Sequence, residues 1–229
     1  MRSAFAEAWR RFEERARTKP SRAAGRSNIP ATSDYLVYLI ALDREPAVAR
    51  AARRLQACLD FPYVNPVPRE ALHITVLSVD HREKLTPEQG ASLFERAAPV
   101  LASLPPFDVT IGAANSFDVA AFLEVHDGGV LREARAKLRA ALPWLAEEGR
   151  DPLVRDGVDT YLPHVSIAYY NAEADARGAV AALAPHRDQV VAKVRVSAVK
   201  LVSVRLPLPS AGVRYSIEAR FRLRRRIAD

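Results

Sequence analysis

Two segments of the chain, 91 residues apart, carry the same alternation of polar and apolar side chains. The first reads "LHITVL" and the second "PHVSIA", and in each a histidine is followed by an apolar residue, a hydroxyl residue and another apolar residue. A strand turns successive side chains to opposite faces. His73 and Thr75 therefore share one face, and so do His164 and Ser166. The chain must fold with two similar strands, one in each half.

Chance and ordinary packing are the alternatives to a functional interpretation of this repeat. At average composition a hydroxyl residue follows a histidine by two positions roughly one time in ten, so one occurrence decides little. Two occurrences on strand-like segments argue against a pair of ordinary core histidines. The other histidines, His81, His126 and His186, lack the pattern and fall near the ends of expected elements, so we expect them at the surface.

The bulk composition is that of an ordinary globular protein. The chain has 229 residues, of which 49% are hydrophobic and 27% charged, enough for one large domain or two small lobes. No apolar run approaches the roughly 20 residues that span a bilayer, and no signal-peptide pattern opens the chain. We expect a cytoplasmic protein without a membrane partner. The single Cys58 excludes an internal disulfide and is expected to be a buried thiol.

The positive charge is concentrated at the N-terminus. Residues 1–33 hold eight Arg and Lys against three Glu, a balance of +5, whereas 26 basic and 24 acidic residues leave +2 for 34–229. We interpret 1–33 as a basic extension and linker, with a short helix over 4–17, and 34–229 as the folded domain. Such an arm could contact phosphates of a polyanion. A solvated arm without a specific partner is the alternative.

Hydrophobic periodicity predicts alternating strands and helices over the rest of the chain. Thr86, Pro87 and Gln89 form the sequence signature of a capped helix start. The long final hairpin requires antiparallel pairing, so we predict an α+β fold with helices outside curved antiparallel sheets. The expected strands are 35–43, 71–80, two within 106–127, 162–170, 190–206 and 214–223, and the expected helices are 48–59, 87–101, 131–142 and 176–187.

With its two His-x-Thr/Ser motifs, one in each half, the chain resembles the 2H phosphoesterase superfamily, which includes the RNA 2',3'-cyclic phosphodiesterases, also called 2'-5' RNA ligases. The resemblance extends over about 35–224: "YLIALD" is similar to the opening strand, "SFDVAAFLEV" and "LREARAKLRAAL" to the middle strand and helix, and "KLVSVRLPLPSAGVRYSIEARFRL" to the closing hairpin. It implies two lobes related by a pseudo-two-fold axis around a central cleft. The segment 1–33 and the loop "EEGRDPLVRDGVDT" lie outside the family pattern.

The motif residues suit the chemistry that the resemblance implies. Opening a cyclic phosphate needs a base for water and an acid for the departing sugar oxygen, and two histidines can supply both. The hydroxyls of Thr75 and Ser166 can donate hydrogen bonds to the nonbridging oxygens. The resemblance assigns His164 as base and His73 as acid, and the reverse assignment stays open. No cofactor is expected, and no Cys/His spacing predicts a metal site.

We therefore expect a monomeric, metal-independent enzyme that opens RNA-terminal 2',3'-cyclic phosphates to 2'-phosphates. Its partners would be RNA ends or small cyclic-phosphate nucleotides. The alternatives are 2'-5' RNA ligation, cleavage of 2'-5' oligonucleotides, opening of the cyclic phosphate of ADP-ribose, and an RNA-end-binding module without turnover. Phe117, Tyr161 and Tyr38 are candidates for stacking on a base, with ordinary packing as the alternative for each.

Overall fold

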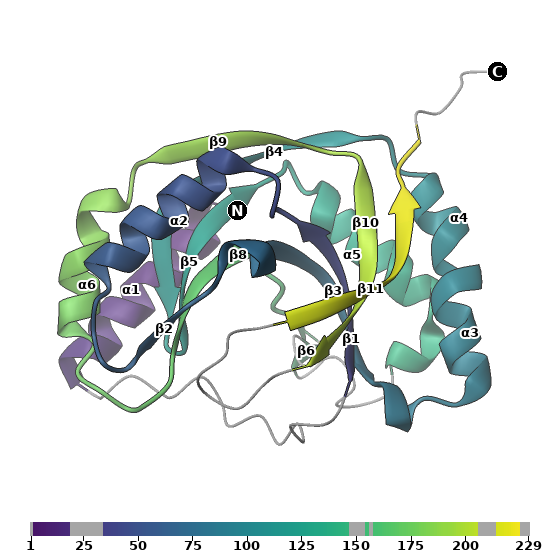
Figure 1. Cartoon of the computed structure of the whole chain (residues 1–229), viewed down its shortest axis with the longest axis horizontal. Coiled ribbons are helices and arrows are strands. Elements are labelled where there is room, and N and C mark those ends of the chain that lie inside the picture. Colours follow the sequence, from purple (N-terminus) through teal and green to yellow (C-terminus); the bar gives the residue numbers. More distant parts are fainter. Residues whose placement is uncertain (1, 19–33, 147–153, 156–157, 206–213, 225–229) are drawn as a thin grey trace.

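Two antiparallel sheets organise the chain, and helices cover their outer sides (Figure 1). The computed structural model describes residues 2–18, 34–146, 154–155, 158–205 and 214–224. Helices α1, α2 and α6 lie at one flank of the molecule, and α3, α4 and α5 lie at the other. The predicted α+β class, with antiparallel sheets and external helices, is confirmed.

The first sheet, here called sheet A, holds the first motif. Its strand order is β11-β10-β1-β3, and every neighbouring pair is antiparallel. Leu36, Tyr38 and Ile40 of β1 face the main core, whereas Val37 and Leu39 belong to a separate small cluster on the other face. The strands are β1 (Tyr35–Ala41), β3 (His73–His81), β10 (Ala198–Arg205) and β11 (Arg214–Arg222).

The second sheet, sheet B, holds the second motif in the order β2-β8-β5-β4-β9, again antiparallel throughout. A separate two-stranded ribbon pairs β6 (Val154–Arg155) with β7 (Val158–Asp159). The strands of sheet B are β2 (Val64–Pro66), β4 (Phe107–Phe117), β5 (Ala120–His126), β8 (His164–Tyr170) and β9 (Val190–Val196).

The long strand predicted over 190–206 is in fact two strands in different sheets. β9 pairs with β4 in sheet B, and after Ser197 the chain enters sheet A as β10. The carbonyl of Ser197 accepts from the amide of Leu223, which anchors the crossing point. The prediction of one continuous strand is wrong because a change of sheet leaves the valine-rich pattern unbroken. The turn expected at 207–212 lies outside the described residues.

The predicted helices are present, with one division. Thr86 Oγ1 accepts from the amide of Gln89 at 3.2 Å, and Gln89 Oε1 accepts from the amide of Thr86 at 2.9 Å, so the capping box is confirmed. The helix expected over 87–101 is divided at Arg96, since Pro99 has no N–H to continue the hydrogen-bond ladder. The helices are α1 (Arg2–Thr18), α2 (Pro46–Cys58), α3 (Pro87–Glu95), α4 (Ala97–Ala102), α5 (Val130–Ala141) and α6 (Arg177–Leu183), with 3₁₀ turns at Arg69–Ala71, Arg82–Lys84, Pro143–Ala146 and Ala184–His186.

Within the described ranges, none of these helices has the length and apolarity needed to cross a membrane.

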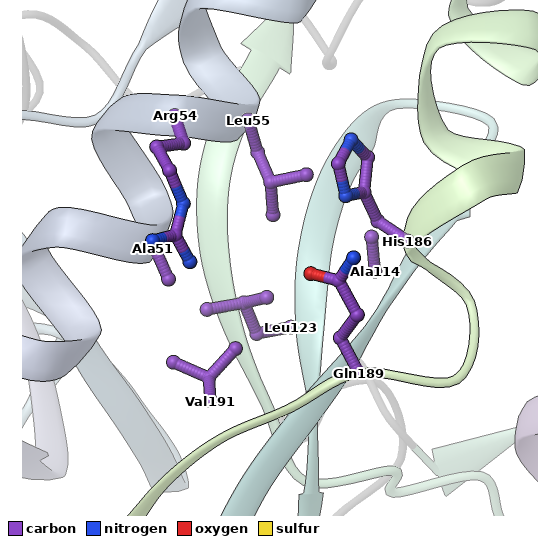
Figure 2. A pocket seen from close by; sticks show the side chains of 8 residues that line it. All are labelled: Ala51, Arg54, Leu55, Ala114, Leu123, His186, Gln189 and Val191. Carbon is purple, nitrogen blue, oxygen red and sulfur yellow. The ribbon is translucent and has the colours of Figure 1, made fainter.

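A small cavity lies on the outer side of sheet B, under α2 (Figure 2). Its volume of about 10 Å³ is room for a single water. Its wall includes Leu123, whose neighbours on β5 point to the opposite face, so this cavity is separate from the strand face that carries His164. The lining residues are Ala51, Arg54, Leu55, Ala114, Leu123, His186, Gln189 and Val191.

Helix α1 belongs to the hydrophobic core. Phe5 and Phe12 are 1% and 2% exposed, and the helix packs on β4 and α6. The alternative of a solvated arm is therefore wrong for Arg2–Thr18. Amphipathic spacing predicted the helix, but nothing in that spacing shows which surface the apolar stripe covers. Residues 19–33 lie outside the described ranges, and a domain boundary after residue 33 stays a prediction.

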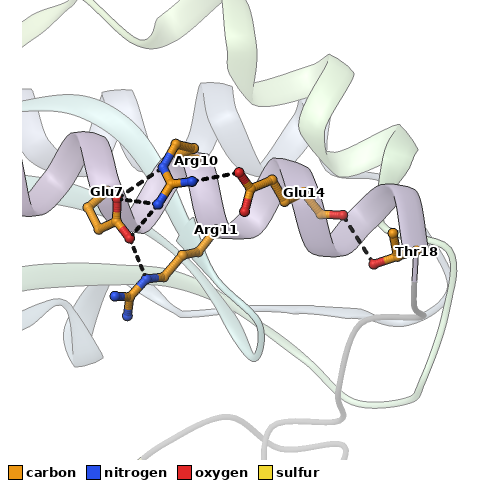
Figure 3. Close-up of polar contacts among 5 residues, drawn as sticks. All are labelled: Glu7, Arg10, Arg11, Glu14 and Thr18. Atoms are coloured by element: carbon orange, nitrogen blue, oxygen red, sulfur yellow. Dashed lines mark hydrogen bonds and ion pairs between the residues drawn. The ribbon is translucent and has the colours of Figure 1, made fainter.

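The solvent face of α1 carries charges that are already paired (Figure 3). Arg10 binds Glu7 at 2.8 Å and Glu14 at 2.7 Å, and Arg11 binds Glu7 at 2.7 Å. Thr18 Oγ1 also donates to the carbonyl of Glu14 at 3.2 Å. These pairs follow the i,i+3 and i,i+4 spacing that stabilises an exposed helix face. Part of the basic charge of this segment is thus neutralised within the helix.

Three smaller expectations are corrected. Cys58 is exposed, because the apolar stripe of α2 continues through Leu55 to Leu59 and leaves the thiol outside it. His81 is buried at the end of β3, with its ring 5.1 Å from that of Tyr35. His126 is half-buried and lies 3.2 Å from the Glu124 carboxylate. A place at the end of a strand therefore does not by itself put a histidine at the surface.

Candidate active site

The two motif strands meet where the sheets adjoin. β3 is an edge strand of sheet A, and it contacts β8 of sheet B although the two are not hydrogen-bonded as a ladder. His73 is the first residue of β3 and His164 the first residue of β8, and both are half-buried. The fold thus brings the two halves of the sequence repeat together at one junction.

Each imidazole is held by the same backbone contact. Nδ1 of His73 lies 2.7 Å from the carbonyl oxygen of Ala71, and Nδ1 of His164 lies 2.7 Å from that of Leu162. A carbonyl oxygen only accepts, so Nδ1 must carry the hydrogen in both rings. The lone pair of each neutral ring is then on Nε2. Both rings are prepared to take up a proton at the same atom.

The two imidazoles influence one another electrostatically. Burial, together with the charge that His73 can carry, lowers the pKa of His164 to about 4, while the bond to Leu162 opposes the shift. Burial also lowers the pKa of His73, against the opposing bond to Ala71. Both rings are consequently neutral at pH 7 in the free protein. A bound anion would raise both pKa values by favouring the charged form.

A β-bulge follows the hydroxyl residue of the first motif. Neighbouring residues of β1 pair with Thr75 and Leu77, so Val76 is an extra residue on β3. A bulge shifts the alternation of side chains by one position. Val76 and Leu77 are both buried, and the half-buried Ser78 joins His73 and Thr75 on the motif face.

The second motif has the same bulge at the same place. Neighbouring residues of β5 pair with Ser166 and Ala168, so Ile167 is the extra residue. The half-buried Tyr169 then shares the face of His164. Burial raises the pKa of the Tyr169 phenol, and a hydrogen bond with the side chain of Ser166 opposes that shift.

Ser78 and Tyr169 are further candidate site residues, which sequence reasoning missed. Each stands five positions after its motif histidine, and strict alternation puts that position on the wrong face. The available signal was a second repeat, with a polar residue at this spacing in both motifs. Only the strand register reveals that both belong to the site.

Phe117 lies beside the second histidine. Its ring centroid is 5.1 Å from that of His164 in an edge-on arrangement, and it stacks on Phe122 at 4.2 Å. Phe122 in turn lies 5.2 Å from the His164 ring. Phe117 is half-buried and stays a candidate for substrate contact. The two phenyl rings also limit the orientations open to the imidazole.

Tyr161 is a structural link between the motifs rather than a stacking platform. It is 2% exposed, and its phenol donates to the carbonyl oxygen of Thr75 at 2.7 Å. The Arg135 guanidinium lies 5.0 Å from the ring centroid, and Arg132 donates to the Tyr161 carbonyl at 2.7 Å. The expectation that a base stacks on this ring is wrong, because protein atoms cover the ring.

The expectation for Tyr38 is also wrong. Its side chain is fully buried, and its phenol donates to the carbonyl of Leu93 at 2.6 Å. Tyr38 faces the main core, whereas its neighbour Leu39 is the residue opposite Thr75. Alternation along β1 was predictable, but the face that meets the first motif depends on the pairing register.

A buried carboxylate supports the strand next to His164. Glu124 is the cross-strand partner of His164 and is 5% exposed. Its Oε1 accepts from Arg187 at 2.7 Å and from Asn115 at 2.8 Å. Asn115 also donates to the carbonyl of Phe5 at 2.9 Å. This network ties α1 to the sheet that carries the second motif.

Comparison with known proteins agrees with this architecture. The fold is similar to that of TT0787 from Thermus thermophilus, at 22% identity and a TM-score of 0.63, covering 83% of this chain and 98% of that one. It is also similar to E. coli LigT complexed with 3'-AMP, at 18% identity and a TM-score of 0.58, covering 83% and 98%. No curated protein matches by sequence. The family model described as the 2'-5' RNA ligase superfamily matches residues 44–206, so the chain belongs to the 2'-5' RNA ligase superfamily.

Proposed function

We propose that this protein is a metal-independent phosphodiesterase that hydrolyses RNA-terminal 2',3'-cyclic phosphates to 2'-phosphates. The observation that carries the proposal is the matched pair of imidazoles. His73 and His164 begin adjoining strands and present Nε2 as the free basic atom, and burial together with the charge that His73 can carry lowers the pKa of His164. One ring can act as a base while the other acts as an acid on a phosphate bound between them.

In the proposed reaction, Nε2 of neutral His164 takes a proton from water as the water oxygen attacks phosphorus. The bond from phosphorus to the 3'-oxygen breaks, and Nε2–H of protonated His73 gives its proton to that oxygen. His164 ends protonated and His73 neutral, and exchange with solvent restores both. The anionic phosphate supports the charged form of His73 that burial alone disfavours.

Thr75 and Ser166 would stabilise the negative charge that develops on the nonbridging oxygens. Each hydroxyl is on the same strand face as its histidine, two residues further along. Donors held in place before the reaction are effective because they need no reorganisation at the transition state.

Reversible 2'-5' RNA ligation is the second candidate, favoured by the family to which the chain belongs. It would use the same groups in the same direction: a 5'-hydroxyl replaces water as the nucleophile, gives its proton to the base and forms the bond to phosphorus, while the bond to the 3'-oxygen breaks and that oxygen takes the proton of the acid. A non-catalytic RNA-end-binding module is the alternative from another class. It would leave unexplained why two titratable groups are held in the same tautomer.

The test is incubation of the purified protein with cyclic-phosphate nucleotides, RNA ends and 2'-5' oligomers in the presence of EDTA, followed by product chromatography. We expect a 2'-phosphate product, its loss in His73→Ala and His164→Ala, and full activity in the control His186→Ala, whose side chain lines the cavity outside the site. Activity that disappears with EDTA and returns with added zinc or manganese would overturn the mechanism. Binding without any turnover would favour the binding module.

A further inference from the structure

A row of side chains leads from the first motif to two cations. Thr75 of β3 is opposite Leu39 of β1, Leu39 is opposite Lys200 of β10, and Lys200 is opposite Arg220 of β11. Cross-strand partners share a face, so all four lie on the motif face of sheet A. Adjacent strands are about 4.8 Å apart, which puts the Cα atoms of Lys200 and Thr75 at about 10 Å.

The side chains of both cations reach solvent, and neither is paired with an acidic side chain among the described residues. Lys200 is half-buried and Arg220 is exposed. By contrast, Arg195 on β9 is paired with Asp108 at 3.1 Å. The flexible stem of a lysine and the planar fork of an arginine both bind phosphate oxygens. The row therefore offers positive charge one side-chain length from the catalytic hydroxyl.

One apolar side chain beside this row, that of Ile217, is open to solvent. Val202 and Ile217 are the next cross-strand pair on the same face, and Ile217 is 56% exposed. Val202 belongs with Leu39 to the small apolar cluster of this face. Leu39 and Val202 are fully buried, so Ile217, beside the two cations, is the apolar side chain of this group that a bound nucleoside could contact.

In sheet B the corresponding row ends at an asparagine, and the nearby Arg187 is already paired with Glu124 at 2.7 Å. Ser166 is opposite Phe122, and Phe122 is opposite Asn115, which takes the place that Lys200 has in sheet A. Asn115 is fully buried and donates to the carbonyl of Phe5 on α1. Helix α1 thus covers the end of the row of side chains in this lobe. The row across sheet A therefore offers a longer substrate positive charge that the matching row of sheet B does not.

We infer that Lys200 and Arg220 form a second phosphate subsite, which binds the 5'-phosphate of the terminal nucleotide whose cyclic phosphate lies between the two motifs. The inference rests on the proposed function and names its substrate class as an oligonucleotide end in preference to a free cyclic mononucleotide. Its basis is the row that connects Thr75 to both cations and the closure of the matching row in sheet B.

The experiment compares three substrates: adenosine 2',3'-cyclic phosphate, the adenosine dinucleotide ending in a 2',3'-cyclic phosphate, and the same dinucleotide with an uncharged methylphosphonate linkage. The double variant Lys200→Gln/Arg220→Gln should lower kcat/KM for the charged dinucleotide about ten-fold or more, because hydrogen bonds to charged groups are among the stronger ones. Values for the mononucleotide should stay within about two-fold. The kcat/KM of wild-type protein for the methylphosphonate dinucleotide should equal that of the double variant for the charged dinucleotide.

Lys193→Gln is the matched control, because it removes the same charge from an exposed position on β9 of sheet B, away from the row. It should leave all three values unchanged. The slope of the logarithm of the dinucleotide binding constant against the logarithm of the salt concentration should also become shallower in the double variant. The expected change in this slope is about 0.7 for each phosphate charge that is no longer neutralised. An equal effect of the double variant on mononucleotide and dinucleotide, or no effect on either, would overturn the subsite.

The two proposals fail in different ways. If wild-type protein turns over neither substrate, the proposed function is wrong. Calorimetric binding of the charged and methylphosphonate dinucleotides then still tests the subsite, in wild type and in the double variant. A wild-type preference for the charged linkage that the variant loses supports the subsite, and equal affinity for both linkages excludes it.

Discussion

The phenol of Tyr161 donates a 2.7 Å hydrogen bond to the carbonyl oxygen of Thr75. Tyr161 stands three residues before His164, so the approach to the second motif is fastened to the strand of the first. The Tyr161 side chain is shielded from water, and a hydrogen bond in such a place is sensitive to the loss of either group. The separation of the two histidines thus depends on Tyr161, a residue that lies outside both motifs.

Tyr161→Phe should destabilise the protein and lower kcat more than it changes KM. The variant leaves the Thr75 carbonyl without this donor, and a buried unsatisfied group destabilises by about 1–3 kcal/mol. Denaturant unfolding and steady-state kinetics measure the two effects. Tyr63→Phe is the control, because the Tyr63 phenol donates to the carbonyl of Asp175 at an exposed position. Unchanged kcat in Tyr161→Phe would mean that the link does not position the motifs.

His73→Ala and His164→Ala should each reduce turnover of a cyclic phosphate by about 10²–10⁴, the usual contribution of a positioned acid or base. The double variant should lose less than the product of the single losses, since both groups act on one transition state. Circular dichroism checks folding, and His186→Ala should retain wild-type rates. A folded double variant with wild-type turnover would leave the sequence repeat without a catalytic role.

Stability should fall as the pH is lowered from about 6.5 to about 4. The pKa of His164 is about 4 in the folded protein and near 6.5 when unfolded, so the unfolded chain binds more protons within that window. Burial shifts the pKa of His73 in the same direction. The His164 share is up to about 3 kcal/mol, and it is fully lost below pH 4.

Urea unfolding at a series of pH values measures this dependence. His164→Asn should flatten the profile between pH 6.5 and 4, because asparagine does not titrate there. His186→Ala should keep the wild-type slope. A profile that is unchanged by His164→Asn would show that other groups control acid stability.

Phe12→Ala should lower the free energy of unfolding by about 3–5 kcal/mol, the usual range for a fully buried phenylalanine. Phe12 is 2% exposed within the main core. Arg11→Ala, at a side chain that is 75% exposed, should change it by less than about 1 kcal/mol. Chemical denaturation followed by circular dichroism separates the two. Equal small effects would restore the interpretation of α1 as an arm.

Much of the fold could be predicted from local pattern. The capping box at Thr86 and Gln89 and the amphipathic helices depend on residues near one another in sequence, so the chain alone shows them. The site was predictable as far as His73 and His164, because their repeat is itself a sequence feature.

The remainder depends on contacts between distant segments. Tyr38 and Leu39 alternate as expected, but the pairing with Thr75 decides which of them faces the site. Tyr169 reaches the site only through a bulge, and strand alternation contains no sign of one. Ser197 follows β9 without a glycine or proline to mark the change of sheet.

The crossing at Ser197 also determines when the site can be completed during synthesis. Sheet A takes β1 and β3 from the first half of the chain and β10 and β11 from its last segment. Two strands alone are only marginally stable in water, so β1 and β3 must wait for strands made more than a hundred residues later. A ribosome that stalls after β8 therefore holds a chain with both histidines and no finished sheet for His73. Activity should appear only after β11 has left the ribosome.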